Sequence, residues 1–342
     1  MLKSRNVICV EERETPGPRE GEALVKVMAC GLCGTDVHIF HGDKGAADNP
    51  FPIVLGHEFS GVVEEINVGG GVRPHVAIGD RVCVDPNVLC GRCEFCLGGI
   101  GHFCEGMTGI GTTVDGGFAE YCAVPLTQLY KIADDCTYGR AALAEPLSCC
   151  LHGIDGCDIR AGENAVVIGG GLIGLIMLQL ARMRGAASVC LIEPVAEKRA
   201  LAESLGADLT IDPFTRDAAQ ELWKNGIRRV STVIECVGSV KTVEQAISLA
   251  GKKSVVMLFG LTKPEDSLSV KPFDFFKREI TLRSSFINPY TMKRAVDLIN
   301  GGKLELDSLI SARLPLDGLG DALGNPDIRK SGKILITPWG GA

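Results

Sequence analysis

Short apolar runs between glycine and proline residues characterise the first part of the chain. Runs of this kind lie at residues 23–27, 61–66 and 80–84. Their length and spacing predict short strands of a β-rich, barrel-like domain that extends to about residue 146.

From about residue 147 to 285, apolar runs of strand length alternate with segments of helical periodicity. Strands are expected at 165–168, 188–192, 233–237 and 254–259, and helices follow the first two of them. This alternation predicts βαβ units and a parallel sheet.

The tail contains a predicted helix at 291–300 and a closing strand at 333–336. We expect it to return to the first domain. The expected organisation is therefore an α/β protein with one domain at 1–146 and 286–342, and a second at 147–285.

Composition limits the classes of function. A chain of 342 residues suggests two domains of about 150 residues each. A net charge of −7 argues against a nucleic acid or an anionic membrane as partner. The longest apolar stretch, 165–180, is broken by glycines and is too short to span a bilayer. The first residues do not resemble a secretion signal, so we expect the protein in the cytoplasm.

Four closely spaced cysteines give the strongest chemical signal. Cys90, Cys93, Cys96 and Cys104 lie in a segment at about 86–106. Zn²⁺ favours four thiolates in a closed shell, so this spacing predicts a structural zinc site. An iron–sulfur cluster is the main alternative. Disulfides are disfavoured by the absence of a secretion signal and by the odd total of 15 cysteines.

A glycine-rich turn follows the predicted strand at 165–168. Gly169, Gly171 and Gly174 form the pattern of a dinucleotide-binding turn, and Leu172 and Ile173 lie where the next helix begins. Free N–H groups at such a helix terminus bind a pyrophosphate. The turn predicts a nicotinamide cofactor.

The residues after the next strand bear on the choice of cofactor. Glu193 ends that strand, at the spacing expected for a carboxylate that binds the ribose hydroxyls and repels a 2′-phosphate. This favours NAD. Lys198 and Arg199 follow closely and leave NADP open.

A second metal site is predicted from residues that are far apart in the chain. Cys33 offers a thiolate and His57 an imidazole, and a catalytic zinc needs a third protein ligand. Glu58 and Glu145 are both candidates for it. The chain is thus expected to bind two zinc ions.

The motifs around these residues resemble a known family. Cys33-Gly34-Thr35-Asp36-Val37-His38, Gly56-His57-Glu58-Phe59-Ser60-Gly61 and Glu145-Pro146-Leu147-Ser148 are similar to zinc-dependent medium-chain dehydrogenases/reductases, especially the polyol and threonine dehydrogenase branch. The resemblance implies a GroES-like catalytic domain, formed by both chain ends, and an inserted Rossmann domain. It also implies a homo-oligomer, a tetramer or dimer.

The resemblance further implies roles for single residues. Thr35 and His38 would relay the substrate proton, by way of a cofactor ribose hydroxyl, and Glu58 and Glu145 would serve as ligand or neighbour of the catalytic zinc. The zinc lowers the pKa of the substrate hydroxyl, so that a hydride can pass to nicotinamide.

The substrate is expected to be a secondary alcohol flanked by other hydroxyls, on a polyol, cyclitol or sugar acid. Ile39, Phe286, Ile287 and Asn288 are the candidate pocket residues. Sorbitol-type enzymes carry polar groups where Ile39 and Ile287 stand, which favours a compact or cyclic substrate. A threonine or butanediol dehydrogenase remains an alternative, as does a catalytically silent binding or redox-sensing relative.

Overall fold

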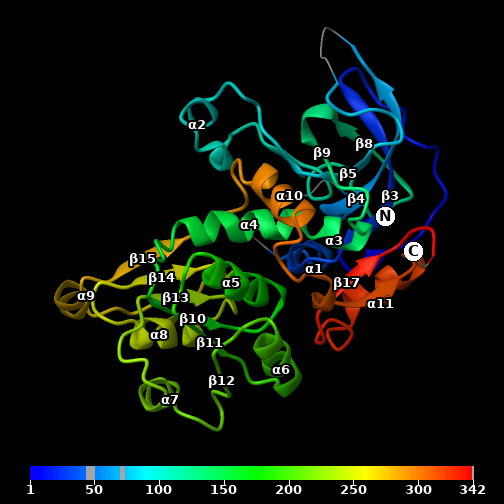
Figure 1. Ribbon diagram of the computed structural model, residues 1–342. Coiled ribbons are helices and arrows are strands. Elements are labelled where there is room, and N and C mark those ends of the chain that lie inside the picture. Colours follow the sequence, from blue (N-terminus) through cyan, green and yellow to red (C-terminus); the bar gives the residue numbers. More distant parts are fainter. Residues whose placement is uncertain (44–50, 70–73, 341–342) are drawn as a thin grey trace. The chain divides into compact units, whose positions relative to one another are not determined.

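The computed structural model describes residues 1–43, 51–69 and 74–340. Its contacts divide the chain into two units (Figure 1). Unit 1 comprises Met1–Ser148 and Pro289–Ala342, and unit 2 comprises Cys149–Asn288.

Unit 1 is built on a seven-stranded sheet. Its strand order is β16-β17-β3-β4-β5-β9, and β8 also pairs with β3. The strands are β3 (Glu22–Gly31), β4 (Glu58–Asn67), β5 (Arg81–Val84), β8 (Tyr121–Pro125), β9 (Leu129–Lys131), β16 (Ile310–Leu314) and β17 (Lys333–Ile336). Because β17 pairs with β3, the tail of the chain belongs to the sheet of unit 1.

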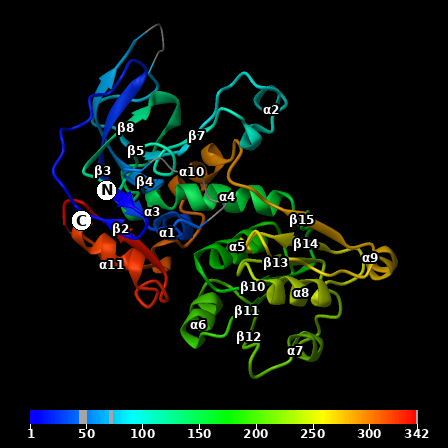
Figure 2. The same ribbon diagram turned by 180° about the vertical axis from the view of Figure 1, so that it is seen from behind.

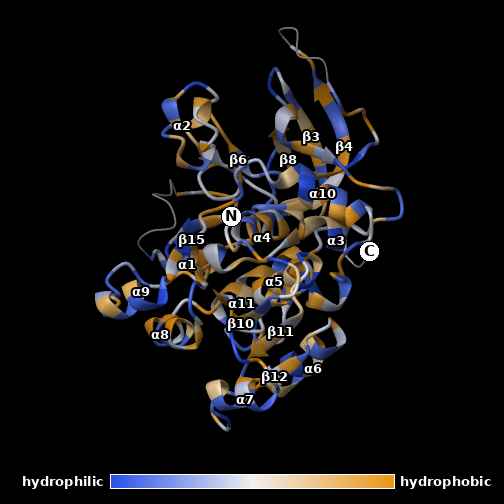
Figure 3. Ribbon diagram, turned by 60° about the vertical axis from the view of Figure 1, so that its left-hand side comes forward, coloured by the Kyte–Doolittle hydropathy of each residue, from blue (hydrophilic) through white to orange (hydrophobic). Residues whose placement is uncertain are grey.

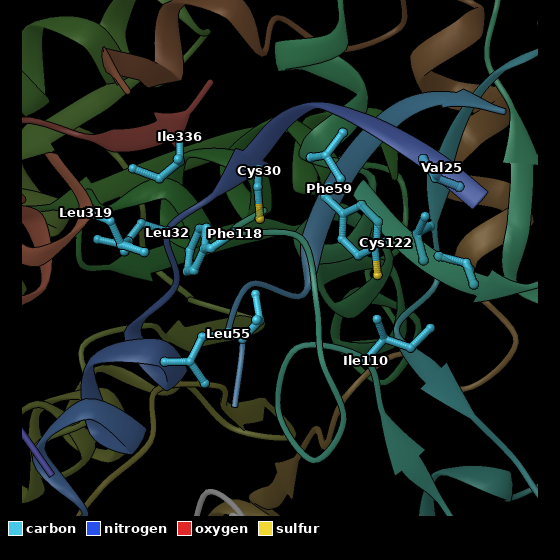
Figure 4. Close-up of a cluster of buried hydrophobic side chains, with 14 of the residues drawn as sticks. Val25, Cys30, Leu32, Leu55, Phe59, Ile110, Phe118, Cys122, Leu319 and Ile336 are labelled. Carbon is cyan, nitrogen blue, oxygen red and sulfur yellow. The ribbon is translucent and has the colours of Figure 1, made fainter. Parts of the chain in front are cut away.

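The core of unit 1 collects apolar side chains from both ends of the chain. Val25, Cys30 and Phe59 from β3 and β4 are buried together with Leu319 and Ile336 from the tail (Figure 4). Burial of this apolar surface stabilises the unit and joins its two chain segments.

The remaining elements of unit 1 are short. The helices are α1 (Gly34–His41), α2 (Glu94–Leu97), α3 (Tyr138–Ala142), α10 (Met292–Asn300) and α11 (Leu319–Gly324), and the small strands are β1 (Leu2–Ser4), β2 (Val7–Ile8), β6 (Asn87–Val88) and β7 (Thr108–Gly109). Helix α4 (Ala144–Asp155) contains the boundary between the units.

Unit 2 is a six-stranded parallel sheet with helices between its strands (Figure 2). Its strand order is β12 (Leu209–Ile211), β11 (Ser188–Ile192), β10 (Asn164–Ile168), β13 (Thr232–Glu235), β14 (Val255–Leu258) and β15 (Thr281–Ser284). The helices are α5 (Leu172–Met183), α6 (Ala196–Ser204), α7 (Ala218–Lys224), α8 (Val240–Leu249) and α9 (Pro272–Arg278).

Hydropathy explains the layers of unit 2. Residues of β10, β11 and β13 are almost all buried, whereas α6 and α8 carry both hydrophilic and hydrophobic residues (Figure 3). Strands buried on both faces read as continuous apolar runs. The expected α/β class, with a GroES-like β-rich domain and a Rossmann domain, is confirmed.

Two predicted strands of unit 2 are longer than the observed ones: the strand expected at 254–259 spans only Val255–Leu258, and the strand expected at 233–237 also ends early. The strand expected at 233–237 ends at Glu235, because its carboxylate accepts hydrogen bonds from the N–H groups of Val237 and Gly238 and turns the chain. Among the described residues, no helix has both the length and the apolar content that crossing a membrane requires.

Candidate active site

The four clustered cysteines of unit 1 converge. The sulfur atoms of Cys90, Cys93, Cys96 and Cys104 all lie within 4.8 Å of one another, around the short helix α2. Backbone N–H donors of Arg92 and Cys93 lower the pKa of Cys90 to about 6. Burial and the neighbouring thiols raise the pKa of Cys96 to about 12. A divalent cation would compensate four thiolates held this closely, so the donor set fits Zn²⁺.

A second group of possible metal ligands forms around the start of β4. One ligand atom each of Cys33, His57 and Glu58 lies within 4.8 Å of the others. Cys33 is the N-cap of α1, and Glu58 is the first residue of β4. Sulfur, nitrogen and carboxylate donors in this number suit a zinc site with an open position.

Gly56 explains how His57 reaches this place. Its φ of 99° lies in the left-handed region, and its carbonyl accepts a hydrogen bond from Gly117 N–H at 2.7 Å. A Cβ at this position would lie 2.8 Å from the backbone nitrogen of Phe118. Only glycine tolerates both constraints, so the residue before His57 determines the turn that presents it.

Asp36 was assigned no role from the sequence, yet it contacts two of the candidate ligand residues, Cys33 and His57. Its Oδ2 accepts the Cys33 backbone N–H at 2.8 Å, and its Oδ1 lies 3.4 Å from Nδ1 of His57. Burial lowers the pKa of His57, but Asp36 and Cys33 raise it well above its usual value. A carboxylate on Nδ1 orients the imidazole and leaves Nε2 for a metal. The spacing of Cys33 and Asp36, that of a capping box, could have identified this role.

Lys333 was also missed, and no local pattern indicates it. It begins β17, and its ammonium group forms an ion pair with Oε2 of Glu58. It also donates to the Leu32 carbonyl at 2.8 Å. Both side chains of the pair are buried, with 5% of Lys333 and 1% of Glu58 exposed. Burial lowers the pKa of Lys333, but Glu58 and Cys33 raise it more, so the net shift is upward.

Glu145 occupies the first turn of α4 and is buried. In the part of the chain that the structure describes, it does not belong to the group formed by Cys33, His57 and Glu58. Geometry therefore favours Glu58 as the carboxylate nearest the other two ligands, although Lys333 also contacts it.

Three other predicted residues lie on α1. Thr35 is partly buried, and His38 has 46% of its side chain exposed and its Nδ1 2.8 Å from the Asp43 carboxylate. Residues three apart on a helix lie on one face, so Thr35 and His38 are neighbours. Ile39 instead packs in the core of unit 1, with 1% exposed.

The glycine turn of unit 2 lies at the carboxyl end of β10. Gly171 is the N-cap of α5, and open space surrounds the place where its side chain would be. A Cβ at Gly174 would lie 1.8 Å from the Gly169 carbonyl oxygen, so helix and turn approach as closely as backbone allows. Leu172 and Ile173 begin α5. The free N–H groups of this helix terminus fit a pyrophosphate.

Glu193 lies beside this turn at the end of β11. Its Oε2 accepts Gly170 N–H at 2.6 Å, and its Oε1 accepts Val195 N–H at 2.9 Å. Arg199 donates to the carbonyl groups of Glu193 and Pro194, at 2.7 Å each, and lies 3.6 Å from Asp212. The Arg199 side chain is therefore engaged, whereas Lys198 is partly exposed.

The other candidate pocket residues are the last three residues of unit 2, Phe286, Ile287 and Asn288. Phe286 is exposed, and Ile287 has a φ of 46°. A positive φ is uncommon for a β-branched residue, so the backbone is strained where the chain leaves unit 2 at Asn288.

Known proteins agree with this combination of a zinc-ligand unit and a dinucleotide-binding unit. Residues 19–134 match the alcohol dehydrogenase GroES-like domain, and residues 173–301 match the zinc-binding dehydrogenase model. The fold and the two sites define a zinc-dependent dehydrogenase that acts on CH–OH groups. The chain belongs to the zinc-dependent medium-chain dehydrogenase/reductase superfamily, in its polyol and threonine dehydrogenase branch.

Individual relatives cover nearly the whole chain. D-arabinitol dehydrogenase 1 of Uromyces fabae is 32% identical over 93% of this chain and 90% of its own. L-threonine 3-dehydrogenase of Pyrococcus furiosus is 32% identical over 95% and 93%. A Sinorhizobium meliloti 1021 protein, described as a zinc-binding dehydrogenase and solved with NADP, is 40% identical over 98% of both chains, with a TM-score of 0.94. Because these relatives are dehydrogenases, their similarity to this chain favours a catalytic role over a catalytically silent binding role.

Proposed function

We propose that this protein transfers a hydride between NAD and a secondary hydroxyl of a polyol, cyclitol or sugar acid. The observation that carries the proposal is the convergence of Cys33, His57 and Glu58 in unit 1, in a chain whose unit 2 has a dinucleotide turn. The chain thus contains candidate ligands for a zinc ion that would bind the substrate hydroxyl, and a turn that would bind the nicotinamide cofactor.

Cys33 and His57 would hold the catalytic zinc, with Glu58 or Glu145 as the third ligand. A zinc ion held there would act as a Lewis acid on the substrate hydroxyl and lower its pKa, and a bound nicotinamide would be the hydride acceptor. Asp36 supports the geometry, because it contacts both Cys33 and His57. The four sulfur atoms near α2 would hold a second, structural zinc.

Thr35 and His38 would carry the substrate proton to solvent. Their positions on one face of α1, and the exposure of His38, support a relay from a partly buried hydroxyl to an exposed imidazole. The Asp43 carboxylate on Nδ1 holds the ring and leaves Nε2 to exchange a proton.

NAD is the proposed cofactor, although the Sinorhizobium neighbour binds NADP. Glu193 places a carboxylate beside the glycine turn, where it would repel a 2′-phosphate. The guanidinium of Arg199 is engaged by two carbonyl groups and Asp212, so Lys198 is, of the two cations in α6, the one left for a 2′-phosphate.

The proposed substrate class rests on the relatives of this chain. The Uromyces relative is a D-arabinitol dehydrogenase, which supports a polyol. The Pyrococcus relative keeps threonine as a second candidate.

One experiment separates these candidates. Purified protein with measured zinc content is screened against polyols, cyclitols, sugar acids, L-threonine and 2,3-butanediol with NAD and NADP, and absorbance at the reduced nicotinamide band is followed. Higher kcat/KM for a polyhydroxy substrate supports the proposal. Preference for ethanol, 2-propanol or threonine would contradict the substrate class.

A homo-oligomer, a tetramer or dimer, is proposed on separate grounds. Strand β15 is an edge of the parallel sheet, and all four of its residues are exposed. An exposed edge strand offers unpaired backbone groups to another chain. A cytoplasmic location is proposed as well, because an odd total of 15 cysteines is unusual for a disulfide-stabilised secreted protein.

A further inference from the structure

A fully buried carboxylate organises the loop after β13. Glu235 ends this strand and has no exposed surface. Its Oε1 accepts hydrogen bonds from Val237 N–H at 2.8 Å, Gly238 N–H at 2.9 Å and Thr242 Oγ1 at 2.8 Å. Because three groups of the 236–242 segment donate to one oxygen of Glu235, this carboxylate fixes the conformation of the segment.

Capping of α8 does not explain this carboxylate. Ser239 already caps the helix, since its hydroxyl accepts Thr242 N–H at 3.2 Å. The second oxygen of Glu235, Oε2, has no hydrogen-bond partner within residues 1–43, 51–69 and 74–340, and a Cβ at Gly260 would lie 2.8 Å from it. Burial of a partly satisfied carboxylate is costly, so its retention calls for another reason.

The loop held by Glu235 borders the dinucleotide turn. A Cβ at Gly169 would lie 2.8 Å from Cγ2 of Val237, so the Val237 side chain packs directly against the first glycine of that turn. Gly169 has a φ of 100°, which requires glycine on conformational grounds as well. On the other side of the turn, Glu193 accepts Gly170 N–H. Carboxylates at the ends of β11 and β13 thus fix the two flanks of the turn that follows β10.

The sheet order assigns different parts of the cofactor to these flanks. The chain builds the sheet from β10 through β11 to β12, and then returns to place β13, β14 and β15 on the opposite side of β10. A dinucleotide lies outside the carboxyl ends of the strands at this reversal, with one half on each side. Glu193 lies on the ribose side assigned to adenosine, so the 236–238 loop lies on the side of the nicotinamide.

We infer that Glu235 is a positioning residue for the nicotinamide half of the cofactor. It acts through the 236–238 loop, whose backbone it holds and whose Val237 it places against Gly169. A loop held in its bound conformation increases affinity, because less ordering is required on binding. This inference rests on the proposed nicotinamide-dependent function.

The test compares a whole cofactor with a fragment that lacks nicotinamide. Binding of NADH and of ADP-ribose to the zinc-loaded protein is measured by calorimetry, with NADPH and 2′-phospho-ADP-ribose as the second pair. We expect Glu235→Leu to weaken NADH binding about tenfold and ADP-ribose binding by no more than about twofold. Glu235→Gln should recover most of the loss, since an amide oxygen also accepts from Val237 and Gly238.

Controls separate this inference from the proposed function. Glu244→Leu removes an exposed carboxylate from the same helix, α8, and should leave both affinities unchanged. If wild type binds no reduced nicotinamide cofactor, the proposed function itself fails. If wild type binds and Glu235→Leu retains both affinities, or loses both equally, the positioning role is overturned.

A milder variant covers the case in which Glu235→Leu does not fold. Thr242→Val removes one of the three donors to Oε1 and keeps the side-chain shape. It should weaken NADH binding about two- to threefold with ADP-ribose binding unchanged. Unchanged NADH binding in a folded Thr242→Val protein would also refute the inference.

Discussion

Replacement of Lys333 by methionine tests how the buried charges of unit 1 are balanced. The variant keeps an unbranched side chain of similar length but removes the ammonium group that pairs with Glu58. It also removes the donor to the Leu32 carbonyl. In protein without metal, the buried Glu58 carboxylate then loses the ammonium group with which it forms its ion pair.

The magnitude follows from the burial of the pair. Only 5% of Lys333 and 1% of Glu58 are exposed. Removal of one partner from a buried pair costs about 3–5 kcal/mol. In a unit of this size, that lowers the melting temperature by roughly 10 °C. If Glu58 contacts the catalytic zinc, the metal replaces the lost cation and the loss is smaller in the zinc-loaded protein.

The assay is urea unfolding of wild type and variant, each with bound zinc and after chelation. Removal of zinc from the four-cysteine site destabilises both proteins equally, so this loss cancels in the difference between their free energies of unfolding. Lys293→Met is the matched control, since it removes one partner of an exposed pair with Asp297. It should change stability by less than about 1 kcal/mol. Lys333→Arg should retain most of the stability because it keeps the charge.

Two results would refute the reasoning in different ways. A Lys333→Met protein as stable as Lys293→Met after chelation would show that the buried pair contributes little. An equal loss with and without zinc would show that Glu58 does not meet the metal. The expectation that Glu145 is the third ligand would then be preferred.

Four further expectations can be checked directly. Cys96→Ser should reduce zinc from two ions to one per chain and lower the melting temperature, measured by metal analysis and calorimetry; unchanged zinc content would contradict the structural site. The zinc affinity of the four-cysteine site should rise with pH, because the pKa of Cys96 is raised to about 12 and zinc must displace its proton. The affinity should fall more steeply below about pH 6, where Cys90 also binds a proton. Competition with a chromophoric chelator measures this affinity, and an affinity that does not change with pH would contradict the expectation. Thr35→Ala should keep both zinc ions and lower kcat about 10²-fold; normal turnover would exclude the relay. Glu193→Ala should narrow the preference for NAD over NADP in kcat/KM, and an unchanged ratio would show that Lys198 or another residue decides it.

Local patterns were sufficient for much of the fold. Strands β11 and β17 lie where the apolar runs predicted them, and α5 begins within the glycine pattern, directly after Gly171. In a fully buried strand or an amphipathic helix, the surroundings of the element impose a hydrophobic pattern on consecutive residues. These elements can therefore be predicted without tertiary information. Strand β15 was not predicted, because its four residues are exposed and form no apolar run.

The candidate site was only partly visible for a related reason. Cys33, His57 and the four clustered cysteines were proposed because ligand chemistry restricts the residue types. Asp36 escaped notice although its position, three residues after Cys33, carries a local signal. Lys333 could not be found, since its Nζ bonds to the carbonyl of a residue 301 positions away.

The sequence by itself determined the secondary structure with continuous patterns, the two chemical signatures and the family to which the chain belongs. These depend on neighbouring residues, whose interactions are present in any conformation of the local chain. The tertiary structure alone decided that Lys333 neutralises Glu58, that Asp36 contacts the ring of His57 and that Val237 packs on Gly169. Buried charges and close backbone approaches are satisfied by whichever group the fold brings near, and sheet pairing between distant strands determines which group that is.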